Sequence, residues 1–362
     1  MKRWFKLLGV ELRKIHGRKI SYILALFLIV IAVATVGIKQ YVQTFLETQA
    51  QEYQESADGF GLRIDVEEIF SEPELTLPQL ESRLVQQNRE IELARSIPGY
   101  DEHASRYRGQ LEQKIVMEGW LERGEVPHSQ ENNLFAELAG NTPYNNLLII
   151  LTVVLALSIA GEYASGTMKQ MFIRPYSRTQ ILTAKYAAAL IYGLALIILN
   201  YLVYFLVHGL VFGFQTANYP IMIAFNGAAL TLPVALHSVL MHLLTWLSIA
   251  MVLALVTLIA VLTRSQGATI GLTLAAGVIA PGIMVTFSEF VNWFSFLPVA
   301  FMDLRPGLTA GLNSLSSDMG FSGSSFSGLS YGLNATLAFA GWAVYLVLFL
   351  ALSLLVFRKR DV

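Results

Sequence analysis

The chain has 362 residues, of which 54% are hydrophobic and only 14% charged, and it contains no cysteine. Soluble domains usually carry about 25% charged residues, so this composition excludes an ordinary soluble enzyme fold. The missing cysteines exclude disulfides, thiolate metal sites and cysteine nucleophiles. Three long stretches lack any Asp, Glu, Lys or Arg, namely residues 186–263, 266–288 and 320–357. Charge-free apolar runs of this length predict transmembrane helices, and the chain is therefore interpreted as a polytopic membrane protein.

The hydropathy pattern predicts an all-α fold with six membrane spans. An apolar run long enough for the hydrocarbon core of a bilayer needs about 20 residues. The predicted spans cover residues 20–38, 144–160, 181–214, 237–262, 268–287 and 334–357.

The distribution of charge predicts the orientation of these spans. Residues 40–143 hold 20 of the 26 acidic residues but only 8 of the 25 basic ones. The segments 1–19, 162–185 and 358–362, together with Arg264, hold 15 basic residues and three acidic ones. Positive charge stays on the cytoplasmic side, so we expect both termini in the cytoplasm and segment 39–143 outside the cell membrane. Nucleic-acid binding is not predicted, because the basic clusters flank apolar helices.

The cytoplasmic segment 1–19 has the pattern of an amphipathic helix. Its apolar side chains recur at helical spacing, and most of its basic residues fall on other faces. Such a helix is expected to lie at the inner membrane surface in contact with lipid. A plain positively charged flank is the alternative, but it would not require the aromatic residues. The predicted lipid-contacting residues are Trp4, Phe5, Leu8 and Leu12, with Ile15 continuing the stripe.

The exterior segment 39–143 is expected to form a helical hairpin. Apolar residues recur at a spacing of three, four and seven until Pro98-Gly99 breaks the chain. A second helix is predicted from Tyr107 to near Gly124, and the hairpin is interpreted as a cap over the pore mouth. In segment 288–333, short re-entrant or interfacial pieces are expected near Pro298, followed by a Gly/Ser-rich stretch. The apolar positions of the first exterior helix are Leu77, Leu80, Leu84, Ile91 and Ala94.

Sequence motifs of common enzyme sites are missing from the chain. There is no Gly-x-x-x-x-Gly-Lys-Ser/Thr phosphate loop, no His-Glu-x-x-His and no Gly-x-Ser-x-Gly. His208, His237 and His242 lie in the longest charge-free stretch, where an ionisable residue is a functional candidate. They are interpreted as structural, because no carboxylate is close in sequence and the last two fall on different helix faces. A metal or proton site is the alternative for these histidines.

The connection 161–180 between the second and third spans is the most informative part of the sequence. Glu162 ends the second span, and Gly166-Thr167 is expected to begin a short helix that the Thr167 hydroxyl caps. Pro175 ends this helix, since proline disfavours the α region for its predecessor Arg174. Ser177 is expected to cap the next helix, which runs through Arg178 and Lys185 into the third span. Met168, Met171 and Phe172 share one face, which is predicted to be exposed and bound by a soluble partner; a structural turn is the alternative.

The pattern Glu-x-x-x-Gly-Thr, then Pro, Ser-Arg and Lys, resembles the coupling-helix region of ABC-2 type exporter permeases. The matching residues are Glu162, Gly166, Thr167, Pro175, Ser177, Arg178 and Lys185. The layout is also similar, with an amphipathic N-terminal helix, six spans and broken helices before the last span. The long segment 39–143 resembles the subset of these permeases that has an enlarged first extracytoplasmic domain.

The resemblance implies a transport subunit without catalytic residues or cofactors of its own. Two permease subunits, identical or paralogous, would enclose the path, and two ABC ATP-binding subunits carrying ATP and magnesium would dock on segment 162–178. Met168, Met171 and Phe172 would fill a groove on the ATPase. Lys169, Arg174 and Arg178 would make contacts at its rim, and Glu162 would fix the end of the second span. The substrate classes suggested are an antimicrobial peptide, an antibiotic, a lipid-like molecule or an ion.

Two other functions are compatible with the sequence. The chain could be a membrane-anchored sensor or scaffold whose exterior domain binds a partner, although six spans are more than an anchor needs. It could also be an ion-coupled secondary carrier that uses the three histidines, although it shows neither internal repeats nor buried mid-membrane carboxylates. Neither alternative requires an ATPase at segment 162–178.

Overall fold

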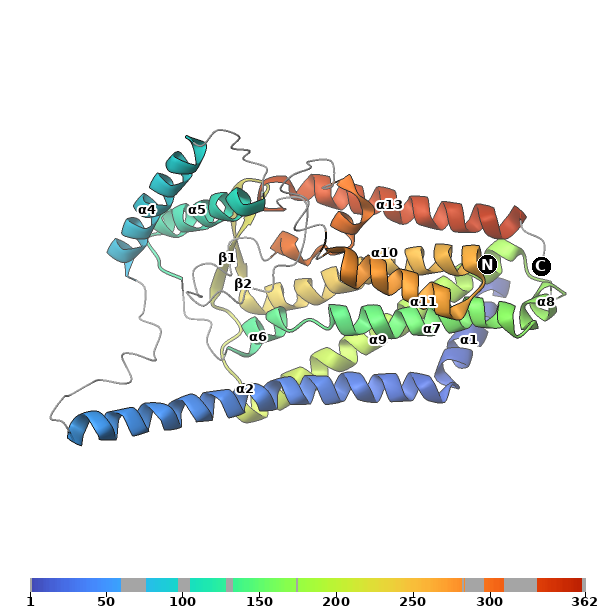
Figure 1. Cartoon of the computed structure of the whole chain (residues 1–362), viewed down its shortest axis with the longest axis horizontal. Coiled ribbons are helices and arrows are strands. Elements are labelled where there is room, and N and C mark those ends of the chain that lie inside the picture. Colours follow the sequence, from blue (N-terminus) through green and yellow to red (C-terminus); the bar gives the residue numbers. More distant parts are fainter. Residues whose placement is uncertain are drawn as a thin grey trace.

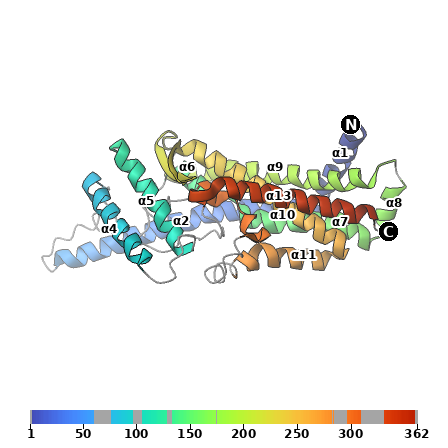
Figure 2. The ribbon, with the colours of Figure 1, turned by 90° about the horizontal axis from the view of Figure 1, so that it is seen from above.

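The computed structural model describes residues 2–59, 76–96, 105–127, 133–173, 175–281, 283, 296–308 and 331–359. These residues form an elongated helical bundle with a β-hairpin and two further helices at one end (Figures 1 and 2). The helices are α1 (Lys2–His16), α2 (Lys19–Gly59), α4 (Leu77–Arg95), α5 (Ser105–Arg123), α6 (Leu134–Gly140), α7 (Tyr144–Ala164), α8 (Thr167–Phe172), α9 (Arg178–Phe212), α10 (Val234–Thr263), α11 (Gln266–Leu274) and α13 (Tyr331–Lys359). A π-helical segment η1 (Ala275–Ile279) follows α11, and two 3₁₀ segments are η3 (Pro298–Phe301) and η4 (Arg305–Leu308).

Five helices among the described residues are long and apolar enough to cross a membrane. They correspond to five of the six predicted spans and lie in α2, α7, α9, α10 and α13. The predicted fifth span, residues 268–287, coincides with the shorter apolar helix Gln266–Ile279, and part of its second half lies outside the described residues. The structure is therefore mostly helical and compatible with a multi-pass membrane protein.

The apolar helices differ in how deeply they are buried. α7 and α10 lie at the centre of the bundle, while most of the apolar length of α2 and α13 is exposed. The main core joins α7, α9 and α10 through residues such as Leu151, Leu196 and Val252. Mean hydropathy alone does not separate central from peripheral helices, because lipid and protein interior are both apolar.

The first span is much longer than predicted. Residues 39–59 were expected to begin the exterior domain, but α2 continues without interruption to Gly59. This extension is rich in Gln, Glu and Ala and contains neither proline nor an internal glycine. These residues favour a helix whether or not they are apolar, so the change to polar composition does not end the helix.

A β-hairpin departs from the all-helical prediction. β1 (Pro220–Phe225) pairs antiparallel with β2 (Ala228–Pro233), in a register that places Phe225 opposite Ala228. The turn residues Asn226 and Gly227 have φ of 51° and 77°. Asn-Gly between apolar runs is a strong signal for a tight hairpin turn, but the sequence analysis assigned no structure to residues 215–236 between the third and fourth predicted spans.

The two helices predicted within segment 39–143 are observed as α4 and α5, which pack against each other, and α5 also packs on the hairpin. Leu80 of α4 is buried with Val116, Met117 and Trp120 of α5 and Met222 of β1. This domain lies at the end of the bundle opposite α1 and α8 (Figure 1). The hairpin thus provides the base on which α5, together with α4, rests.

Close contact between α5 and the hairpin depends on a glycine. A Cβ added at Gly119 would lie 2.5 Å from Ala229 Cβ and 2.5 Å from Met222 Sδ. The methionine can move, but the alanine Cβ moves only with the backbone of β2. A side chain at position 119 must therefore separate the helix from the strand.

We expect Gly119→Ala to lower the thermal stability of the domain formed by α4, α5 and the hairpin, with an overpacking penalty of about 1–3 kcal/mol. Gly109 lies in the same helix with open space around its Cβ position, so Gly109→Ala should stabilise the helix by about 0.5–1 kcal/mol. Protection of α5 amides from hydrogen exchange measures both changes. Changes of the same sign in the two variants would contradict this account of the interface.

The short piece expected near Pro298 coincides with the start of η3, a second piece expected at residues 292–294 lies outside the described residues, and η4 was not predicted. Phe301 packs so closely on α13 that a side chain at Gly341 would clash with its ring. The backbone N–H of Leu304 donates to Ser248 Oγ at 2.9 Å, so this irregular backbone is held against α10. Residues 284–295 and 309–330 lie outside the described part of the chain.

Candidate functional site

The connection from α7 to α9 turns at the end of the bundle that also holds α1 (Figure 1). α7 ends at Ala164, Gly166 adopts a left-handed backbone with φ of 69°, and α8 begins at Thr167. Glycine takes this conformation without steric penalty, so Gly166 allows the chain to reverse sharply. The predicted short helix is thus present at Thr167–Phe172.

Thr167 does not cap α8 as predicted. No side-chain hydrogen bond caps this helix. Instead, Thr167 Oγ1 donates to the carbonyl oxygen of Glu162 at 3.4 Å and lies 2.9 Å from Ser165 Oγ. Because its hydroxyl reaches backwards along the chain, Thr167 ties the start of α8 to the last turn of α7.

The methionines of α8 are buried, which overturns the prediction that they form an exposed face. Met168 is 0% exposed and belongs to the main core, and Met171 is 8% exposed. Met171 packs with Leu7 of α1 and Ile181 of α9. A six-residue helix lying across the ends of longer helices buries its apolar side within its own chain, and flexible methionines fill the irregular gaps there.

The exposed side of α8 has a different composition. Thr167 and Gln170 are exposed, and Ile173, directly after the helix, is 86% exposed. The side chains of Lys169 and Phe172 and the whole of Arg174 lie outside the described residues. Within the described part of this segment, Ile173 is the large apolar side chain that faces solvent.

The helix after this connection begins as predicted. Ser177 Oγ accepts a hydrogen bond from the N–H of Gln180 at 3.2 Å, and the Gln180 side chain accepts one from the N–H of Ser177 at 3.1 Å. This reciprocal pair is a capping box and confirms Ser177 as the N-cap of α9. Arg178 donates to the carbonyl oxygen of Arg358 at 3.3 Å, which joins α9 to the end of α13. Pro175 lies exposed in the connection between the two helices.

Four charged side chains meet where α1, α7 and α9 converge. Lys185 Nζ lies 2.9 Å from Glu11 Oε2 and 2.8 Å from Glu162 Oε2. Lys14 Nζ lies 2.9 Å from Glu11 Oε1 and 3.0 Å from Glu162 Oε1. Each carboxylate therefore bridges both ammonium groups, and the four form a closed ring of alternating charge, which we call the charge ring.

The charge ring is almost removed from water. The side chain of Lys185 is 0% exposed, that of Glu11 1% and that of Glu162 9%, whereas Lys14 is 37% exposed. Lys185 Nζ also lies 3.4 Å from Ser158 Oγ. Burial lowers the pKa of Lys14, but its bonds to the two carboxylates outweigh this effect and raise the pKa above its usual value. Lys14 therefore stays protonated at neutral pH.

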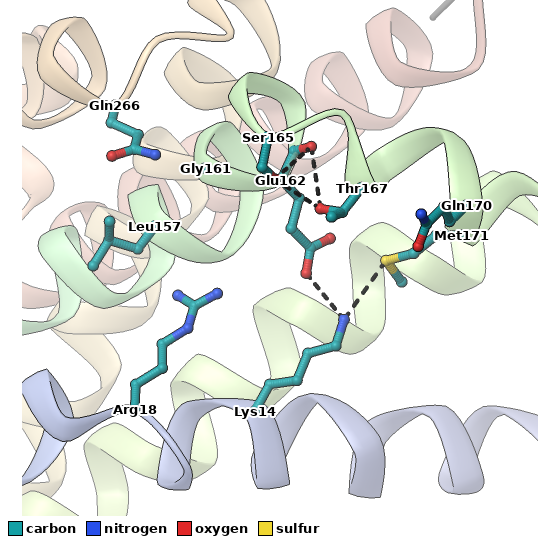
Figure 3. Close-up of a pocket in the computed structure, with 10 residues that line it drawn as sticks. All are labelled: Lys14, Arg18, Leu157, Gly161, Glu162, Ser165, Thr167, Gln170, Met171 and Gln266. Atoms are coloured by element: carbon teal, nitrogen blue, oxygen red, sulfur yellow. Dashed lines mark hydrogen bonds and ion pairs between the residues drawn. The ribbon is translucent and has the colours of Figure 1, made fainter.

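The charge ring also reaches α8. Lys14 Nζ lies 3.7 Å from Met171 Sδ, and Figure 3 shows this contact beside the Lys14–Glu162 ion pair. Through Met171 and Lys14, the short helix is connected to the same group that joins α1, α7 and α9. A displacement of α8 must therefore disturb buried charges unless all four helix ends move together.

Sequence reasoning identified Glu162 and Lys185 but missed Glu11 and Lys14. A signal for Glu11 was available, because Leu8, Glu11 and Ile15 follow one another at helical spacing. A carboxylate on an apolar stripe predicts a buried cationic partner. Which cation it meets depends on how α1 docks, and the sequence does not contain that information.

The amphipathic helix is confirmed as α1, but its apolar face is used differently from the prediction. Leu8 is buried, Leu12 packs against the main core, and Trp4 Nε1 donates to Thr183 Oγ1 of α9 at 3.1 Å. Phe5 is 61% exposed. The helix thus packs mainly on the bundle, and Phe5 is the residue of this group that can contact lipid.

The three histidines have structural surroundings in the described part of the chain. His237 Nε2 lies 2.7 Å from the carbonyl oxygen of Leu308, and His242 Nδ1 lies 2.9 Å from that of Ser238. His208 is stacked against Tyr204. No group of three potential metal ligands from His, Asp and Glu occurs among the described residues. These contacts give His237 and His242 structural roles, whereas both ring nitrogens of the buried His208 lack a hydrogen-bond partner among the described residues.

A second buried ion pair lies at the opposite end of the bundle. Arg305 donates from Nε and Nη2 to the two carboxylate oxygens of Asp303, at 2.9 and 2.7 Å. It also donates to Thr142 Oγ1 at 2.9 Å, and its guanidinium lies 4.5 Å from the ring centroid of Tyr144. Burial lowers the pKa of Arg305, but Asp303 more than compensates and raises it. The Asp303 carboxylate, only 8% exposed, is a buried structural group that holds η4 against α7.

Comparison with known proteins gives a family and a distant relative. The chain is 24% identical over 241 residues to "Uncharacterized protein YhcI" of Bacillus subtilis (strain 168), which covers 66% of this chain and 72% of the relative. The family described as "Protein of unknown function (DUF2705)" matches residues 115–362. This match includes α7, α8, α9 and the last helix, and it extends over well more than half of the sequence. The chain therefore belongs to the family described as "Protein of unknown function (DUF2705)".

Proposed function

We propose that the chain is the membrane-spanning subunit of an ATP-driven ABC exporter. Its termini and α8 face the cytoplasm, and the exterior helices α4 and α5 lie outside the cell membrane. A second permease subunit, either a copy or a paralogue, completes the translocation path. Two separate ATP-binding subunits bind at α8 and hydrolyse ATP, so this chain contributes no catalytic residue.

One observation carries the proposal, namely the way α8 is held. It is a six-residue helix between two long apolar helices, at the end of the bundle where the basic residues of α1 gather. One side of it is locked into the chain by Met168 and Met171, and the other side is exposed. A helix with one face fixed to the membrane bundle and one face free is suited to transmit a mechanical push from a soluble protein.

The charge ring supplies the stiffness that such a transmission needs. A force on Gln170 or Ile173 passes through Met171 to Lys14 and the two buried carboxylates. Separating one member of the ring would leave a buried charge unpaired, at a penalty of about 3–5 kcal/mol. The ends of α1, α7 and α9 therefore respond to α8 as one body.

Because Met168 and Met171 are buried, the residues proposed to contact the ATPase differ from those expected from the sequence. Met168 and Met171 act inside the permease, and the contact surface is formed by Thr167, Gln170 and Ile173. An isolated apolar side chain at the centre of a polar patch is a common anchor for a partner's pocket. The transported substrate belongs to one of the classes suggested by the family resemblance: an antimicrobial peptide, an antibiotic, a lipid-like molecule or an ion.

We expect Ile173→Asp to abolish co-purification of an ATP-binding subunit with the tagged chain from mild detergent. The substitution places a charge where the partner buries an apolar anchor, and loss of such an anchor weakens binding by at least about 2 kcal/mol, or more than tenfold. The measurement is capture from native membranes, with the bound proteins identified by mass spectrometry.

The matched control is Leu93→Asp. Leu93 is 68% exposed on α4, in the exterior domain, so the same chemical change occurs far from α8. Capture that is equal for both variants would argue against docking at α8. If no ATPase is captured with the unaltered chain while it remains folded, the exporter proposal is wrong.

A further inference from the structure

A cavity of about 520 Å³ opens between α1, α7, α8 and α11, next to the charge ring (Figure 3). Its polar lining consists of cations, hydroxyls and amides in addition to the Glu162 carboxylate. The cations are Lys14 and Arg18, the hydroxyls are those of Ser165 and Thr167, and the amides are those of Gln170 and Gln266. Lys14 and Thr167 already donate within the chain, but the guanidinium of Arg18 and the amides of Gln170 and Gln266 offer N–H donors, so the cavity is suited to an acceptor.

The electrostatic balance of the cavity favours an anion. Lys14 and Glu162 belong to the charge ring, whose two positive and two negative charges cancel. Arg18 adds a further positive charge, and its guanidinium points into the space between Leu157 and Glu162 (Figure 3). No ion pair with Arg18 occurs in the part of the chain that the structure describes. A guanidinium offers five N–H donors in a planar fork that matches phosphate oxygens.

The residues next to Arg18 are suited to contact a lipid at a membrane surface. Directly after it, α2 begins its long apolar run with Tyr22, Ile23 and Leu26, each more than half exposed. An acyl chain can lie along these side chains while its headgroup occupies the cavity. Seven of the first 19 residues are Lys or Arg, and basic segments and pockets at the ends of transmembrane helices attract anionic headgroups.

We propose that this cavity binds a phosphate group, with Arg18 as its principal ligand and the side-chain amides of Gln170 and Gln266 as further donors. The phosphate is that of an anionic phospholipid from the adjoining leaflet or that of a free phosphate anion. Bound there, it bridges the end of α1 to α8 and α11 and makes the position of α8 sensitive to anionic ligands. This site needs the membrane position of the bundle but does not depend on an ATPase partner.

The test compares lipid retention by the purified full-length chain in native mass spectrometry. Phosphatidylglycerol and phosphatidylcholine with identical acyl chains are supplied together. The expected result is preferential retention of one phosphatidylglycerol, and Arg18→Gln should reduce that preference about tenfold, the loss of one charge-assisted interaction. Arg13→Gln removes an exposed cation of α1 that does not line the cavity, and it should leave the preference unchanged.

The remaining arms identify the source of the phosphate and expose a wrong assignment. The second arm measures the unfolding midpoint in the absence of anionic lipid. If millimolar inorganic phosphate raises this midpoint for the unaltered chain but not for Arg18→Gln, the site is supported with a free anion as its ligand. The proposal would be overturned by an equal loss of phosphatidylglycerol in Arg18→Gln and Arg13→Gln, or by no loss in either variant combined with no effect of inorganic phosphate. An Arg18→Gln variant that retains lipid normally but no longer captures a soluble ATPase would also overturn the proposal, because the cavity would then bind part of the ATPase. Equal unfolding midpoints in phosphatidylcholine alone establish that both variants are folded.

Discussion

Replacing Lys185 with methionine is expected to lower the free energy of unfolding by about 3–5 kcal/mol, the usual penalty for breaking a buried ion pair from one side. Lys185 is fully buried and contacts both Glu11 and Glu162 within 2.9 Å. Without it, two buried carboxylates share the single, partly exposed ammonium of Lys14. Whole domains are stable by only about 5–15 kcal/mol, so the loss is a large fraction of the total. Thermal unfolding of the purified chain in mild detergent measures it.

A second variant separates lost charge balance from lost packing. Adding Glu11→Gln to Lys185→Met leaves one carboxylate facing one ammonium, and we expect it to restore more than half of the lost stability. Lys6→Met is the control, because Lys6 is exposed on the same α1 helix and should change stability by less than about 0.5 kcal/mol. If the double variant is less stable than Lys185→Met alone, the closed ring is not the source of the effect.

Replacing Arg305 with methionine is expected to have a comparable effect at the other end of the bundle. Asp303 is 8% exposed and receives two hydrogen bonds from Arg305, so the substitution leaves a buried carboxylate without its counter-charge. We again expect a loss of about 3–5 kcal/mol, together with release of η4 from Tyr144 and α7. Increased hydrogen exchange of residues 303–308 should accompany the lower unfolding temperature.

The chain contains an exposed ion pair that serves as a control for the buried Asp303–Arg305 pair. Arg123 and Glu125 are also two residues apart and form a 2.9 Å ion pair, but their side chains are 44% and 50% exposed. Arg123→Met should therefore cost less than about 1 kcal/mol. A second test is Asp303→Asn combined with Arg305→Met, which removes both charges and should recover most of the stability lost by Arg305→Met. Equal losses for Arg305→Met and Arg123→Met would contradict the importance of burial.

Local features of the candidate site were predictable because they depend on neighbouring residues. Gly166 marks the turn into α8, and Ser177 with Gln180 marks the start of α9. The Asn226-Gly227 turn was equally visible, but residues 215–236 were left unassigned between two predicted spans and the hairpin was missed. Helix ends in polar sequence were harder to predict, since residues 39–59 carry no stop signal and α2 simply continues.

Sequence by itself therefore determined the long apolar helices, the paired helices α4 and α5 and the short helix between α7 and α9. Hydropathy, propensity and capping act over a few residues and can be recognised without a structure. Only the tertiary structure decided that Met168 and Met171 point inward, that Asp303 is buried, and that Lys185 meets Glu11. Glu11 and Lys185 are 174 residues apart, and burial of a side chain depends on what packs against it. The chemistry of the candidate site follows from the docking of α1 on α7 and α9, which no single segment of the chain specifies.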